Sequence, residues 1–123
     1  MDTASGTPVG PYPGGLLAIL VTTEDGRVRS GMTGPELEEL LGRLGADGDR
    51  YVVVEHGRIE DQVFIQAWRG NDGVYEVEHR AGGPDRQFGV RVAEPAEVAA
   101  LIVSWARFDD SWQAAGWAPI GGR

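Results

Sequence analysis

The feature that most constrains the fold is the alternation of apolar and charged side chains in residues 74–92, VYEVEHRAGGPDRQFGVRV. If the Gly-Gly-Pro-Asp segment is the loop of a β-hairpin, Val77 lies opposite Val90 and one face of the hairpin is continuously apolar. The other face then carries Glu76 opposite Arg91, a cross-strand ion pair. A shift of one residue would set glutamates against apolar side chains, so we predict the first register. Its apolar pairs are Tyr75–Val92, Val77–Val90 and His79–Phe88.

Two segments have the spacing of amphipathic helices. Thr33 and Glu36 form a capping box, and leucines follow at i, i+3, i+4 and i+7. This helix is predicted to end at Gly45. A second helix is predicted from near Pro95 to about Arg107, with glutamates at its start and the arginine at its end, as the helix dipole favours. The predicted buried stripes are Leu37, Leu40, Leu41 and Leu44 in the first helix and Val98, Leu101, Ile102 and Trp105 in the second.

Four further segments are rich in β-branched, aromatic or aliphatic residues and are bounded by turns, which is typical of strands. They are residues 16–22, 27–30, 51–55 and 63–68. The order of strands and helices predicts an α+β fold, a mainly antiparallel sheet of about five to six strands with two helices on one face, in a two-layer sandwich. The 123 residues suit one domain, residues 16–120, after a flexible proline- and glycine-rich tail, residues 1–15.

Composition excludes several classes of function. The chain has no cysteine, which excludes disulfides, thiolate nucleophiles and thiolate zinc sites. Its longest apolar run, residues 16–21, is far shorter than a membrane span, and we expect a cytoplasmic protein. The net charge of −8 repels nucleic acid and suits a basic protein partner, although an acidic balance also keeps a small protein soluble.

No pattern of residues predicts catalysis, a metal or a cofactor. His56 and His79 fall on different strands, and their spacing matches no ligand motif, so we interpret both as ordinary strand histidines. The Gly82-Gly83 pair joins two strands and does not lead into a helix, so it is a turn and not a phosphate loop. None of the serines has the context of an activated nucleophile; they are Ser5, Ser30, Ser104 and Ser111.

Alternation in residues 63–68 places Phe64 and Trp68 on the face opposite Ile65. If the helices cover the Ile65 face, this aromatic pair is partly exposed beside glutamines, as at a protein interface. The alternative is that the tail residues Trp112 and Trp117 fold over the pair.

Three segments together resemble a known family: a strand YEVEHRAGGPDRQF, a helix ending in SWARFDDSW, and a terminal GWAPI. They are similar to small actinobacterial proteins related to immunity protein family one of bacterial polymorphic toxin systems. The resemblance covers about residues 32–120. It implies an α+β protein that is not an enzyme and that neutralises a cognate toxin, often a nuclease or a deaminase, by direct binding.

We therefore predict a protein-binding module of the immunity type, with a basic toxin domain as one candidate partner. The predicted contact residues are Glu76, Glu78, Arg91, Phe64, Trp68, Glu36 and Glu39. The alternative is a small ligand-binding accessory protein or an enzyme, with a pocket between sheet and helices lined by Tyr75, His79 and Trp105. Both a monomer and a homodimer that uses the exposed sheet face or an edge strand remain open.

Overall fold

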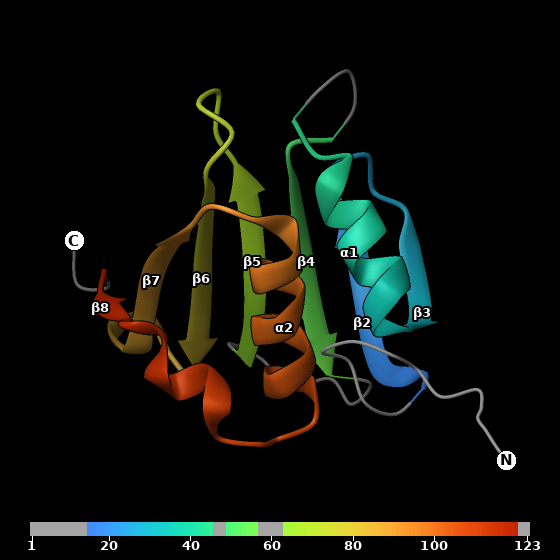
Figure 1. The fold of residues 1–123 in the computed structure, drawn as a ribbon. Helices are drawn as coiled ribbons and strands as arrows, with labels where there is room; N and C mark the ends of the chain where they lie inside the picture. The colour runs from blue at the N-terminus through green and yellow to red at the C-terminus, as the bar shows by residue number, and fades with distance from the viewer. Residues whose placement is uncertain (1–14, 46–48, 57–62, 121–123) are drawn as a thin grey trace, which may run out of the picture.

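The computed structural model of this chain describes residues 15–45, 49–56 and 63–120 (Figure 1). The predicted tail, residues 1–15, lies outside this part except for its last residue. The strands are β2 Leu17–Thr23, β3 Val28–Met32, β4 Tyr51–His56, β5 Val63–Arg69, β6 Tyr75–Ala81, β7 Gln87–Val92 and β8 Ala118–Pro119. The helices are α1 Gly34–Gly42 and α2 Pro95–Ala106, with short 3-10 turns at Pro84–Arg86 and Ser111–Ala115.

The described strands form one antiparallel seven-stranded sheet in the order β3-β2-β4-β5-β6-β7-β8. Both α1 and α2 lie on one face of it, which confirms the predicted α+β two-layer arrangement (Figure 1). The strand beyond the predicted six is β8, two residues that pair with β7. The predicted hairpin register is confirmed, because Val77 pairs with Val90 and Glu76 with Arg91.

The core lies between the sheet and the two helices. Leu37 and Leu41 of α1 are fully buried, whereas Leu40 is half-buried at the margin of the core. The helix ends at Gly42, earlier than the predicted end at Gly45, although the left-handed φ of +87° at Gly45 does turn the chain away. The predicted capping box of Thr33 and Glu36 is present.

Helix α2 is buried over a wider arc than its predicted stripe. Val98, Ile102 and Trp105 are buried as expected, but Leu101 is only half-buried. The reason is that α2 packs against α1 and against the 3-10 turn Ser111–Ala115 as well as against the sheet, so residues beside the stripe are covered too. These additional buried residues are Ala99, Val103 and Ser104.

Polar groups of the sheet fasten the C-terminal end of α1. The Tyr75 hydroxyl donates to the carbonyl oxygen of Leu41 at 2.7 Å. The Arg69 guanidinium donates to the carbonyl oxygens of Gly42 at 3.1 Å and Leu44 at 3.2 Å, and it lies 5.1 Å from the centre of the Tyr75 ring. The carbonyl oxygens of Gly42 and Leu44 have no N–H partner within the helix, so Arg69 acts as a C-terminal cap.

Residues 109–120, here called the C-terminal strap, fold back over the far end of the helix-covered face. The rings of Trp112 and Trp117 meet His79 edge-on, with centroids 4.8 and 4.6 Å away. The indole N–H of Trp117 donates to the Trp112 carbonyl oxygen at 2.7 Å. The alternative in which these tryptophans cover Phe64 and Trp68 is therefore wrong, since His79 belongs to the opposite face of the sheet.

Neither α1 nor α2, the helices in the described part of the chain, has the length and apolar character of a membrane span.

Candidate protein-binding face

The face of the sheet that points away from α1 and α2 is here called the open face. Its side chains follow from the strand registers, because residues paired across neighbouring strands point to the same side. Three rows of paired residues run across its centre. They are Tyr51–Trp68–Glu76–Arg91, Val53–Gln66–Glu78–Gly89 and Phe64–Arg80–Gln87.

An aromatic pair stands exposed in the first row. Trp68 keeps 54% of its surface accessible and Tyr51, directly across the strand pair from it, keeps 37%. They border a shallow hollow of about 730 Å³. A tryptophan in this position leaves a large apolar area in water, which is typical of surfaces that another molecule covers. The hollow is lined by Arg50, Tyr51, Val53, Gln66, Ala67, Trp68, Gly70, Asn71, Glu76 and Glu78.

Ion pairs order one end of the open face. Arg91 lies 2.8 Å from Glu76 through Nε and 2.8 Å from Asp72 through Nη2. The backbone N–H of Val74 and the same guanidinium hold the pKa of Asp72 below its ordinary value. Each of these three side chains is about half exposed, so the cluster positions charge without contributing much to stability.

Glu78 lies at the centre of the face and has a different set of partners. Its Oε1 accepts from the side-chain amides of Gln66 at 3.1 Å and Gln87 at 2.9 Å. Arg80 turns to Gln87, at 2.9 Å through Nε, and lies over the Phe64 ring at 5.4 Å. In the described residues no arginine pairs with Glu78. Neutral amides hold its carboxylate, and this negative charge lines the hollow.

The structure brings together five of the predicted contact residues and separates two. Phe64, Trp68, Glu76, Glu78 and Arg91 share the open face. Glu36 and Glu39 lie on α1, on the other side of the sheet.

Sequence reasoning missed Tyr51 as a member of the aromatic pair. The signal that locates it is the register of β4 against β5, which sets Tyr51 opposite Trp68. The segment that joins these strands is too long for a turn type to fix that register from the sequence alone.

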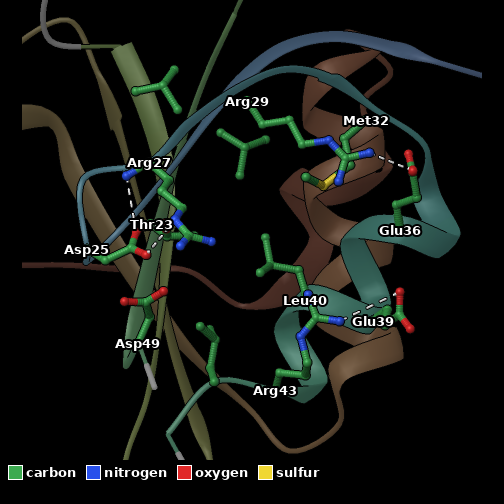
Figure 2. A pocket seen from close by; sticks show the side chains of 13 residues that line it. Thr23, Asp25, Arg27, Arg29, Met32, Glu36, Glu39, Leu40, Arg43 and Asp49 are labelled. Atoms are coloured by element: carbon green, nitrogen blue, oxygen red, sulfur yellow. Dashed lines mark hydrogen bonds and ion pairs between the residues drawn. The ribbon is translucent and has the colours of Figure 1, made fainter. Parts of the chain in front are cut away.

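Glu36 and Glu39 belong to a second hollow, a groove of about 660 Å³ between α1 and the edge of the sheet at β2 and β3 (Figure 2). Arg29 reaches across it to Glu36 at 2.6 Å, and Arg43 pairs with Glu39 at 3.7 Å along the helix. The Thr33 backbone N–H and Arg29 hold the pKa of Glu36 below its ordinary value. Both carboxylates are thus neutralised by arginines of the same chain, which weakens their attraction for an external cation.

The residues predicted to line a ligand pocket are part of the core instead. Tyr75 is fully buried, and His79 and Trp105 keep about one twentieth of their surface. The groove in Figure 2 does lie between sheet and helix, but none of these three residues lines it. Within the described residues there is also no cluster of three or more His, Cys, Asp or Glu side chains arranged to hold a metal ion.

The two histidines sit in separate aromatic environments. His56 is stacked between Trp105, with ring centroids 4.0 Å apart, and Phe108, at 4.5 Å. His79 is enclosed by Phe88 and the strap tryptophans, and burial lowers its pKa. The two histidines lie on different strands, as predicted, and each packs against aromatic rings.

Comparisons with protein-family models, with curated proteins and with solved structures gave no match for this chain.

Proposed function

We propose that this protein is a non-enzymatic binding module that holds a basic protein domain against the open face of its sheet, in the manner of an immunity protein that neutralises a toxin. The observation that carries the proposal is the exposed Tyr51–Trp68 pair beside Glu78, a carboxylate held by neutral amides. Aromatic anchors within a polar rim are the usual makeup of an interface hot spot.

The chemistry of this hollow favours an arginine or lysine of the partner as the central contact. A cation that enters it meets the Trp68 ring and the Glu78 carboxylate together, gaining a cation–π contact and an ion pair. The net charge of −8 adds long-range attraction for a basic domain and repulsion for nucleic acid. Rigid strands hold the contact residues, so little conformational entropy is lost when they bind.

Inhibition then follows from occlusion. A toxin that acts on nucleic acid needs a basic surface for its substrate, and a protein seated on that surface blocks substrate access. We propose that the module acts in the cytoplasm, with the chain as a monomer or a homodimer before it binds. It requires no metal or cofactor.

Co-expression with the products of neighbouring genes tests the proposal. We expect one of them to co-purify in a stoichiometric complex, to be basic, and to be toxic to cells unless this protein is present. Binding should weaken with salt, because attraction between opposite charges is screened. A chain that binds none of these products and protects cells from none of them would exclude the immunity-type function.

Glu78→Gln tests the central contact in that complex, with Glu97→Gln, an exposed carboxylate of α2, as the matched control. The first substitution keeps the size of the side chain and removes its charge, so we expect about a tenfold or larger loss of affinity. The control should change affinity by no more than about twofold. Equal effects of the two variants would mean that overall charge, and not the open face, drives binding.

A second candidate function rests on the groove of Figure 2. Its volume of about 660 Å³ is that of a small-molecule site. Its rim, however, consists of arginine–carboxylate pairs that already satisfy one another, whereas ligand sites are mostly apolar with a few convergent polar groups. Screening small molecules by NMR would decide, since a true ligand would shift the methyl signals of Met32 and Leu40, which line the groove.

A further inference from the structure

Phe108 lies in a backbone conformation and an environment that neither local preference nor burial explains. It follows the C-terminal cap residue of α2, Arg107, and has a φ of +60°, the left-handed region that bulky side chains avoid. At the same time 75% of its surface is exposed.

The hydrogen bonds around Phe108 are those of a Schellman motif. The Phe108 N–H donates to the Trp105 carbonyl oxygen at 3.2 Å, and the Asp109 N–H donates to the Ser104 carbonyl oxygen at 3.2 Å. Glycine is the usual residue at the left-handed position of this motif, because it has no side chain to strain the backbone. The chain carries a phenylalanine there and gains little burial in return.

The ring of Phe108 ends a stack of three aromatic side chains. Trp105 lies against His56 with 16° between the ring planes, and His56 lies against Phe108 with 11° between them. Trp105 is buried and Phe108 is exposed, so the stack runs from the core to the surface. The outer side of the last ring is therefore a flat, accessible aromatic surface held by the layers beneath it.

Two acidic residues, Asp109 and Asp110, follow Phe108 directly in the chain. The Ser104 hydroxyl, followed by the backbone N–H and hydroxyl of Ser111, holds the pKa of Asp109 below its ordinary value, so this carboxyl stays ionised at neutral pH. Asp110 is exposed, and its side chain accepts a long hydrogen bond of 3.5 Å from the side-chain amide of Gln113. Among the described residues, these two carboxylates follow Phe108 directly in the chain, and one guanidinium, that of Arg107, precedes it.

We propose that Phe108, with Asp109 and Asp110, is a docking site for an arginine side chain in a peptide segment of a partner protein. A guanidinium is planar and cationic, so it stacks on an aromatic face and pairs with carboxylates at the same time. A nucleobase also stacks, but its phosphate would be repelled by the two aspartates. The backbone strain at Phe108 is then tolerated because the ring serves binding. Strained residues tend to occur at binding and active sites.

This site is separate from the hollow on the open face and does not depend on the proposed function. Tyr51 and His56 are at opposite ends of β4, roughly 17 Å apart at the rise of a strand. The stack also includes Trp105 of α2, which lies on the helix-covered face (Figure 1).

The first test compares thermal unfolding of the wild-type protein with that of Phe108→Gly and Phe108→Tyr. Glycine removes the ring and relieves the backbone, so we expect a melting temperature that is unchanged or raised by a few degrees. The tyrosine variant keeps ring and strain and should resemble the wild type. A large loss of stability in Phe108→Gly would show that the ring is needed to hold the fold, and would overturn the proposal.

The second test titrates the protein with a nonapeptide of alternating glycine and arginine and follows the NMR signals of residues 107–112. The arginine peptide should shift these signals, and Phe108→Gly should weaken that binding by about two- to fivefold, as expected for an exposed cation–π contact. Phe108→Tyr should restore it, and a lysine version of the peptide should bind more weakly.

Trp68→Ala serves as the control, since it lies on the open face and should leave the shifts at residues 107–112 unchanged. The proposal is overturned if the arginine peptide leaves these signals unmoved, if Phe108→Gly binds it as well as the wild type, or if a single-stranded oligonucleotide moves them instead.

Discussion

The two faces of the sheet are built from the same strands and differ in how their polar groups are used. On the helix-covered face, Tyr75 and Arg69 direct their donors to carbonyl oxygens of the segment that ends α1, and apolar side chains fill the remaining space. On the open face, Glu76, Glu78 and Arg91 pair with neighbours on the surface, and Trp68 stays in water. The comparison separates residues that hold the fold from residues that the fold presents to solvent.

The largest difference between the faces should appear when the same substitution is made on each. Leu37→Ala removes a fully buried side chain between α1 and the sheet, and we expect a loss of about 2–5 kcal/mol in the free energy of unfolding. Leu20→Ala removes a half-buried leucine of the open face and should cost about 1 kcal/mol or less. Urea unfolding of both variants measures this, and equal losses would contradict the division of the two faces.

Replacing an arginine should also lower the free energy of unfolding more on the helix-covered face than on the open face, but the difference should be smaller than for the leucines. Arg69→Met leaves the carbonyl oxygens of Gly42 and Leu44 without their charged donor, and we expect a loss of roughly 1.5–3 kcal/mol. Arg91→Met breaks exposed ion pairs with Asp72 and Glu76 and should cost about 0–1 kcal/mol. The measurement is again urea unfolding, at low and at high salt, because the surface pairs alone should be sensitive to screening.

The smallest effect concerns His79 beneath the strap. Burial lowers its pKa from the ordinary 6.5, so the unfolded chain binds the proton more readily than the folded one. The contribution of neutral His79 to stability is therefore complete above pH 6.5 and is lost as the pH falls from there through the lowered folded-state pKa.

We expect the melting temperature of the wild type to fall across that range, and the fall to be shallower in His79→Phe. Asp72 and Asp109, whose pKa values are lowered, affect stability in a separate and more acidic range. Their contribution is lost as the pH falls below their ordinary pKa of 3.8. The same slope in His79→Phe and in the wild type would show that another group titrates there.

The elements of the fold could be predicted from the sequence where one local rule decided the outcome. The alternation around Val77 fixed the last hairpin register, and the capping box at Thr33 fixed the start of α1. The end of α1 was placed too late, because it is set by Arg69, a residue 24 positions beyond Gly45 that reaches α1 only in the folded chain.

The placement of the tail could not be predicted for a similar reason. The strap tryptophans pack on His79, and nothing in the spacing of residues 109–120 distinguishes that face from the one carrying Trp68. The left-handed turn at Phe108 also lacks its usual sequence signal, the glycine of a helix C-terminus. The candidate site was predicted in part: alternation places Trp68 and Glu78 on one face, whereas Tyr51 required the pairing of β4 with β5.

The most direct test of the open face as the binding surface is Trp68→Ala, measured for stability and for partner binding in the same preparation. Trp68 is 54% exposed, so the free energy of unfolding should change by no more than about 1 kcal/mol. The affinity for the co-purified partner should fall at least about 30-fold, as for a hot-spot tryptophan, while Leu16→Ala, another exposed apolar side chain, leaves it unchanged. Unaltered affinity in Trp68→Ala, or a loss of stability as large as that of Leu37→Ala, would contradict the account.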